Sequence, residues 1–238
     1  MPPTNIDKDS VIGIIMLDTV FPRIPGDIGN SDTFPFPVEY KTVEGADPKR
    51  VVIDADPQLL QPFIDAARSL ESGGVKAIGT SCGFLAIFHQ ELVNAVDIPV
   101  FSSSLLQVHF AGETMKKNQK VGILTARSQS LTRKHFIGVG IESYPLAISG
   151  MDAAEEFSAV FIEGKKDIDI DKCRGEIVAA AKKMVDGNPD IGAIVLECTN
   201  MPPYARAIQD AVGLPVFDVV TMINYAYWSL NRQVFANG

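Results

Sequence analysis

An internal repeat constrains the fold of this 238-residue chain more than any other feature of its sequence. Adding 116 to the residue number carries eight residues of the first half onto identical residues of the second: Ala77, Ile78, Cys82, Ala95, Val96, Pro99, Val100 and Phe101 map to Ala193, Ile194, Cys198, Ala211, Val212, Pro215, Val216 and Phe217. An ungapped match at a fixed offset indicates two copies of one structural unit. We therefore expect two similar halves, each with one cysteine at the same place.

Short apolar runs alternate with helix-like stretches along both halves. Strands are predicted at 11–17, 38–43, 75–79, 98–101, 120–125, 139–145, 191–196 and 214–219, and helices at 56–72, 84–96, 105–117, 128–136, 171–185, 202–212 and 221–231. This alternation is typical of an α/β fold with parallel sheets flanked by helices. We predict two pseudo-symmetric α/β domains, 1–104 plus 215–238 and 105–214, with the site in the cleft between them.

The composition limits the partners of the chain. A net charge of −8 and a pI near 4.9 argue against nucleic acid or an anionic membrane, but leave a small anionic ligand open. Residues 1–7 lack the features of a signal peptide, and no apolar run is long enough to cross a membrane. We expect a cytoplasmic protein, a homo-oligomer, with its three cysteines reduced.

The positions of Cys82 and Cys198 indicate chemistry. Each ends a predicted buried strand and opens a predicted helix. Ligands of open α/β sheets collect at the carboxyl ends of strands, and a helix N-terminus there is expected to lower a thiol pKa from about 8.5 toward neutrality. Two such thiols that face each other make an acid–base pair. Cys173 lies within a predicted helix with Ile170, Ile177 and Met184 on one face, which indicates a core residue.

Several polar and small residues accompany the cysteines at the predicted strand ends. The substrate-binding candidates are Asp18, Thr19, Ser81, Gly83, Phe84, Thr199 and Asn200. Hydroxyl and amide side chains here serve either a ligand or the helix N-cap, and Asp18 either orients a reacting group or caps a turn. The proline-rich stretch 21–37 is interpreted as a cover over the site, and its Arg23 either binds a carboxylate or faces solvent. No histidine has metal-ligand spacing with either cysteine, so no metal is expected.

The segments Gly79-Thr80-Ser81-Cys82 and Glu197-Cys198-Thr199, one in each half, resemble the aspartate/glutamate racemase superfamily. That superfamily includes hydantoin racemases, maleate isomerases and arylmalonate decarboxylases. The resemblance implies that Cys82 and Cys198 are the two catalytic bases and that no cofactor is used. It also implies that Gly83, Thr199 and Asn200 hold the substrate carboxylate, and that Asp18 is the acid found after the first strand.

The chain departs from amino-acid racemases beside both cysteines. Gly83-Phe84 stands where they commonly have Asn-Thr, and Asn200 stands where glutamate racemases commonly have histidine. These changes favour a less polar or cyclic substrate, such as a hydantoin, over free aspartate or glutamate. We predict a cofactor-independent racemase or epimerase that moves a proton next to the carbonyl of a small carboxylate or amide. The alternatives are a maleate-type cis–trans isomerase, an arylmalonate-type decarboxylase, and a non-catalytic carboxylate-binding protein.

Overall fold

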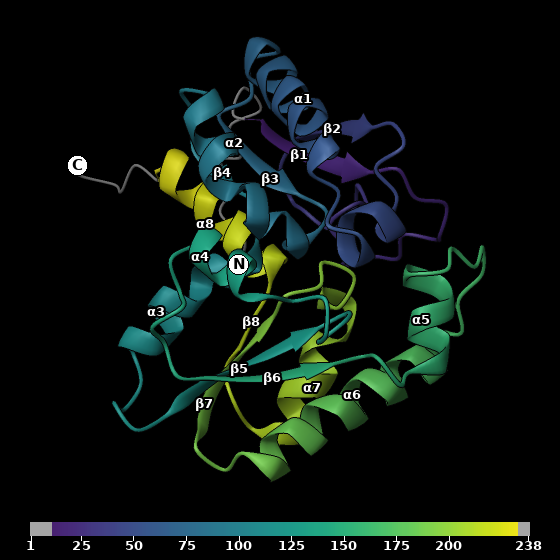
Figure 1. The fold of residues 1–238 in the computed structure, drawn as a ribbon, viewed down its shortest axis with the longest axis vertical. Coiled ribbons are helices and arrows are strands. Elements are labelled where there is room, and N and C mark those ends of the chain that lie inside the picture. Colours follow the sequence, from purple (N-terminus) through teal and green to yellow (C-terminus); the bar gives the residue numbers. More distant parts are fainter. Residues whose placement is uncertain (1–10, 233–238) are drawn as a thin grey trace.

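Continuous apolar runs form the central strands of two parallel sheets in the computed structural model of this chain, which describes residues 11–232 (Figure 1). The first sheet has the order β2-β1-β3-β4, and the second repeats it as β6-β5-β7-β8. The strands are β1 Ile12–Leu17, β2 Val38–Val43, β3 Ala77–Thr80, β4 Val100–Phe101, β5 Lys120–Thr125, β6 Leu146–Gly150, β7 Ile191–Leu196 and β8 Val216–Phe217. The predicted α/β fold class is confirmed, whereas the interpretation of residues 1–7 lies outside the described residues.

The strand register reproduces the sequence repeat. In the first sheet Ile78 pairs with Val100, and in the second Ile194 pairs with Val216, which is the same pair moved by 116 positions. The two units are therefore copies of each other at the level of individual residue pairs.

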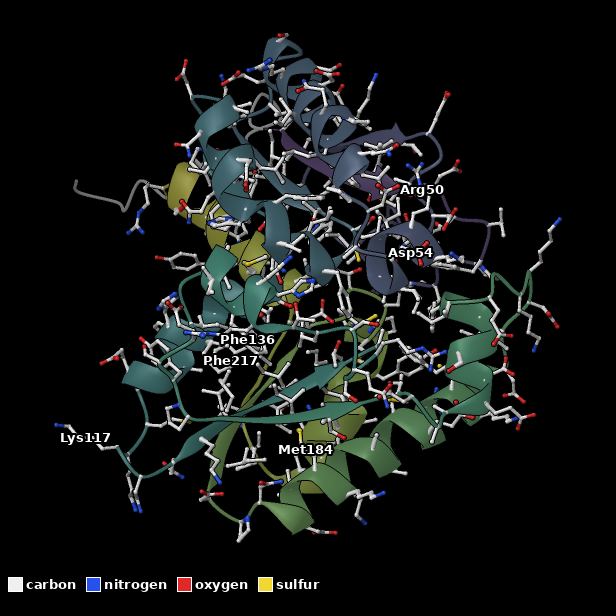
Figure 2. All side chains as sticks on the ribbon, viewed as in Figure 1. Arg50, Asp54, Lys117, Phe136, Met184 and Phe217 are labelled. Atoms are coloured by element: carbon white, nitrogen blue, oxygen red, sulfur yellow. The ribbon has the colours of Figure 1, made fainter. Side chains whose placement is uncertain are left out.

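Two glycines occupy equivalent places in the opening strands of the two sheets. Gly13 of β1 pairs with Ile78, and Gly122 of β5 pairs with Ile194. A Cβ at Gly122 would lie 2.9 Å from Cε of Met184, which is labelled on α6 in Figure 2. The missing side chain lets the helix pack close to the sheet, which explains why both halves have glycine there.

Helices cover the faces of both sheets. They are α1 Leu60–Ser72, α2 His89–Ala95, α3 Gln107–Glu113, α4 Arg133–Gly138, α5 Glu155–Phe161, α6 Ile170–Gly187, α7 Ala205–Val212 and α8 Val219–Leu230. Three of these α-helices are shorter than predicted, with seven or eight residues each, because the first part of each predicted helix is a 3-10 helix. The 3-10 helices are Gly83–Phe88 before α2, Ser104–Leu106 before α3 and Pro202–Tyr204 before α7. No helix within residues 11–232 has the length and apolarity that a membrane crossing requires.

The region 128–165 differs most from the prediction. The strand expected at 139–145 is wrong: those residues form a turn, and β6 starts after Pro145. Proline has no N–H to donate to a ladder, and here only its carbonyl is used, as the acceptor for Val121. The stretch 147–165, where the sequence predicts neither a strand nor a helix, contains most of β6 and all of α5.

The last helix returns to the first unit. α8 packs against the first sheet, where Met222, Ile223 and Tyr227 share a buried cluster with Ile12 and Ile14. In Figure 1 this yellow helix lies beside the first sheet although it ends the described chain. β8 pairs with β7, so the second sheet extends to Phe217 rather than ending at residue 214.

The loop between β1 and β2 is held by its apolar side chains. Phe21, Ile28, Phe34 and Phe36 are buried, and the ring of Phe36 stacks on Tyr227 with centroids 3.8 Å apart. This packing fixes the loop against β1 and α8.

Candidate active site

Both repeat cysteines line one cavity between the two units. Cys82 follows β3 and Cys198 follows β7, each two residues after the strand ends, and each is 8% exposed. The cavity has a volume of about 30 Å³, which is room for a water molecule or two, so its walls must move apart before a small ligand can enter. The lining residues are Leu17, Thr19, Phe21, Arg23, Pro48, Val52, Ser81, Cys82, Gly83, Phe84, Ala126, Phe161, Ile162, Glu197, Cys198, Thr199 and Asn200.

Three of the predicted site residues join the two units at the cavity floor. The Ser81 hydroxyl accepts a hydrogen bond from the Leu17 N–H at 2.8 Å, and the Thr199 hydroxyl donates to the Ser81 carbonyl at 2.5 Å. A Cβ at Gly83 would lie 2.2 Å from the carbonyl oxygen of Glu197. Gly83 was expected to admit a ligand, but its close neighbour is the opposite half of the chain.

Three phenylalanine rings line the cavity. Phe84 is 1% exposed and meets the ring of His135 edge-on, with centroids 5.2 Å apart. Phe21 of the first unit and Phe161 of α5 in the second meet edge-on at 5.1 Å, so rings from both halves close one side. These rings limit the exposure of the two cysteines to solvent.

Arg23 supplies the positive charge of the cavity. Its guanidinium donates to the Asp27 carboxylate at 2.9 Å and to the Thr19 hydroxyl at 2.8 Å, and it lies 4.5 Å from the ring centroid of Phe21. The side chain is largely buried, so the interpretation of Arg23 as a residue that faces solvent is wrong. A guanidinium has five N–H donors, so further donors remain for a ligand.

Asp27 also orients the second cysteine through an amide. Its Oδ2 accepts a hydrogen bond from Nδ2 of Asn200 at 2.7 Å, which turns the amide oxygen toward Cys198. The Cys198 thiol donates to that oxygen, with Sγ and Oδ1 3.6 Å apart. An acceptor at this position stabilises the protonated thiol.

Asp18 is not part of the cavity. Its carboxylate is exposed and accepts a hydrogen bond from the Gly45 N–H at 3.0 Å. Asp18 therefore caps a turn and does not orient a reacting group. Its neighbour Thr19 does line the cavity.

Glu197 brings a carboxyl group into the site. The side chain is fully buried, and its Oε2 accepts a hydrogen bond from the Thr125 hydroxyl at 2.6 Å. Burial raises the pKa of Glu197 to about 7, although the Thr125 hydroxyl and the Ala126 N–H oppose the shift. The carboxyl group therefore changes its charge near neutral pH.

The expected lowering of the thiol pKa values is wrong. Burial raises the pKa of both Cys82 and Cys198, and the Glu197 carboxylate raises both further. Cys82 caps a 3-10 helix, and a turn separates Cys198 from the next helix, so no α-helix dipole acts directly on either sulfur.

The surroundings of the two sulfurs are unequal. The N–H groups of Phe84 and Leu85 and the charge of Arg23 lower the pKa of Cys82. The Asn200 N–H lowers that of Cys198, but the charges of Asp27 and of Cys82 raise it. Cys82 is therefore the cysteine that its neighbours favour as thiolate.

Comparison with known proteins identifies the family. The family model described as Asp/Glu/hydantoin racemase matches residues 46–223. The chain belongs to this family. The resemblance found in the two cysteine segments is thereby confirmed for the fold and the superfamily.

Relatives of this chain are named as lyases rather than as racemases. The chain is 31% identical over 234 residues to a dimethylsulfoniopropionate lyase of Durusdinium sp. clade D, a match that covers 94% of this chain and 77% of the relative. It is 32% identical to dimethylsulfoniopropionate lyase 7 of Emiliania huxleyi, with 94% and 70% covered.

Solved structures with the same fold have lower sequence identity. A glycine-to-cysteine mutant of arylmalonate decarboxylase in a sulfate-associated form has a TM-score of 0.64 at 14% identity, with 96% of this chain and 97% of that chain covered. Allantoin racemase from Pseudomonas fluorescens has a TM-score of 0.63 at 14% identity, with 93% and 91% covered. These likenesses support the two-unit α/β fold.

Asp27 and the side chain of Glu197 were not among the predicted site residues. Asp27 lies in a loop without periodicity, and only its spacing of four from Arg23 hints at a pair. Glu197 carries a stronger signal, because an acid that directly follows an apolar strand is costly to bury without a purpose. Within residues 11–232 no three side chains among histidine, cysteine, aspartate and glutamate come together as metal ligands.

Proposed function

We propose that this protein is a lyase that removes the proton next to the carboxylate of a small substrate and expels a sulfonium group from the adjacent carbon. The substrate type is 3-(dimethylsulfonio)propanoate, as the names of the 31–32% identical relatives suggest. The observation that carries the proposal is the asymmetry of the cysteine pair. The Asp27–Asn200 contact holds Cys198 as a thiol, while Arg23 and two backbone N–H groups favour the thiolate of Cys82.

Elimination needs one base, and Cys82 fits that role. The Cys82 thiolate takes the α-proton, and the electron pair of that C–H bond forms the carbon–carbon double bond. The bond from the β-carbon to sulfur breaks, and its electron pair leaves with dimethyl sulfide. Acrylate remains, and the proton on Cys82 returns to solvent. The leaving group departs neutral, so no acid is required at that end.

The positive charge of the substrate is expected to stabilise the Cys82 thiolate. Burial disfavours the Cys82 thiolate, and a cation placed beside a buried thiol lowers its pKa. The sulfonium group is such a cation, so the bound substrate helps to form its own base. Arg23 is the group that binds the substrate carboxylate and stabilises the enolate-like charge during proton removal.

A second candidate is the racemase or epimerase expected from the sequence. The observation that favours it is that both sulfurs line one cavity at equivalent strand ends. Racemisation requires a base on one face of the α-carbon and an acid on the other, with exchanged roles for the opposite enantiomer. The Asn200 acceptor opposes that exchange because it favours one protonation state of Cys198.

Headspace gas chromatography with 3-(dimethylsulfonio)propanoate tests the proposal. We expect dimethyl sulfide from the wild type, loss of at least about a thousandfold in kcat/KM for Cys82→Ser, because general-base catalysis is typically worth two to four orders of magnitude, and full activity for Cys173→Ala. Cys173 is a buried core cysteine of α6 and is the matched control. Release of no dimethyl sulfide, together with racemisation of an aspartate or hydantoin followed by polarimetry, would select the second candidate.

The rate of alkylation tests the expected difference in reactivity between Cys82 and Cys198. With iodoacetamide at pH 8 and mass-spectrometric quantification, we expect Cys82 to react faster than Cys198. Asn200→Ala removes the acceptor of the Cys198 thiol and is expected to narrow the difference. Equal labelling of the two cysteines in the wild type would contradict the assignment of Cys82 as the base.

A further inference from the structure

Glu197 leaves one oxygen of a buried carboxyl group unused. Its Oε2 is bound by Thr125, whereas Oε1 is buried and has no hydrogen-bond partner in the described part of the chain. An unsatisfied buried oxygen of this kind costs about 1–3 kcal/mol, and more when it is charged. A buried group that bears such a cost calls for an explanation, and contact with a ligand is one.

This oxygen lies beside Gly83. Glu197 is among the lining residues, and a Cβ at Gly83, the lining residue next to Cys82, would lie 2.3 Å from Oε1. The neighbouring polar groups are already paired: Arg23 and Asn200 with Asp27, and Thr199 with the Ser81 carbonyl. Oε1 of Glu197 is thus an acceptor that the residues around the cavity leave for a bound molecule.

Charges of opposite sign act on Cys82. Arg23 lowers the pKa of Cys82 and Glu197 raises it, so both act on this sulfur. Arg23 is paired with Asp27, whereas the Glu197 carboxyl group has neutral partners, the Thr125 hydroxyl and the Ala126 N–H. A molecule bound beside Cys82 therefore has both a guanidinium and a carboxyl group in the lining of its cavity.

We propose that Glu197 binds the cationic group of the substrate and makes the site selective for zwitterions, with a carboxylate and a sulfonium or quaternary ammonium group on neighbouring carbons. The carboxylate end of this arrangement rests on the proposed function, but the cationic end rests on Glu197 itself. The rings of Phe84 and Phe161 line the same cavity, and aromatic rings suit the methyl groups of such a cation.

Two ligands of the same shape test the proposal. 3-(Trimethylammonio)propanoate carries the cation, and 4,4-dimethylpentanoate replaces its nitrogen with carbon. By isothermal titration calorimetry at pH 8, we expect the wild type to bind the cationic ligand at least about tenfold more tightly, and Glu197→Gln to lose that preference. Glu163→Gln removes the same charge from an exposed position outside the lining of the cavity and is expected to keep the preference.

The outcomes separate this inference from the proposed lyase activity. A wild type that discriminates between the ligands but releases no dimethyl sulfide would keep the zwitterion site and reject the lyase. Equal affinity for the two ligands in the wild type, or an undiminished preference in Glu197→Gln, would overturn the role of Glu197 even if dimethyl sulfide is released.

The wild type alone provides a second measurement if the Gln variant does not fold. Because the pKa of Glu197 is about 7, the preference for the cationic ligand should fall as the pH drops from 8 to 5.5 and the carboxyl group gains a proton. Burial raises the pKa of Cys82 and Cys198, so both thiols keep their protons over this range, and Arg23 stays charged and paired with Asp27. Burial lowers the pKa of His135 behind Phe84 from 6.5, so a fall in the preference between pH 8 and 6.5 belongs to Glu197. A preference that is constant over this pH range would contradict the proposal.

Discussion

Replacement of Gly83 by alanine tests the contact that closes the cavity. The new Cβ would lie 2.2 Å from the carbonyl oxygen of Glu197 and 2.3 Å from its Oε1. These separations are about 1 Å shorter than ordinary van der Waals contact, and one of the atoms belongs to the backbone of a buried strand end. The two units must therefore move apart, or β7 must shift, before the methyl group fits.

The cost should approach the upper end of the range for overpacking, about 3 kcal/mol in the free energy of unfolding. For a chain of this length, that corresponds to a fall of about 6–12 °C in Tm. Differential scanning fluorimetry and urea unfolding both measure the change. Activity should be lost as well, because the shift separates Cys82 from Cys198.

Gly175 supplies the matched control. It lies within α6, and a Cβ there would meet nothing within 4 Å. Gly175→Ala is expected to stabilise the protein by about 0.5–1 kcal/mol, because alanine loses less backbone entropy in a helix. If Gly83→Ala were as stable as the wild type, the close approach of the two units at this point would be wrong.

Two further predictions concern carboxyl groups. Asp18→Asn should leave kcat/KM within about twofold of the wild type, because Asp18 caps an exposed turn outside the cavity; a loss comparable to that of Cys82→Ser would return it to the site. Glu197→Gln should gain stability relative to the wild type as the pH rises from 5 to 8. The pKa of the carboxyl group is about 7 in the native state and 4.5 in the unfolded state, so the free energy of unfolding of the wild type falls by roughly 3 kcal/mol over that window. Urea unfolding at pH 5 and pH 8 measures the difference between the two proteins. A difference in stability that is the same at both pH values would refute the burial of the Glu197 carboxyl group.

The sequence was sufficient for the fold because the repeat and the apolar runs act locally. The register of β3 with β4 and of β7 with β8 follows the offset found in the sequence. The errors lie where tertiary contacts decide. Residues 155–161 form a seven-residue helix whose first N–H groups are bound by Glu176 of α6, and no local pattern announces that contact.

The site was predictable at its sulfurs and less so around them. Strand-end positions brought Cys82 and Cys198 to one cavity, as two parallel sheets require. The thiol environment was misjudged, because a helix start was expected to outweigh burial, whereas both sulfurs are enclosed by aromatic and aliphatic side chains. Asp27 was missed because its partners Arg23 and Asn200 meet only through a loop that has no regular structure.

The fixed offset of 116 also pairs residues that differ. Ser81 stands at the position equivalent to Glu197, and Phe84 at that of Asn200. Had the halves been separate molecules joined as identical partners, every replacement would appear twice around the cavity, giving two acids or none. Because the two halves are one chain, each can change without the other. The two sides of a single cavity can therefore have different side chains at equivalent positions.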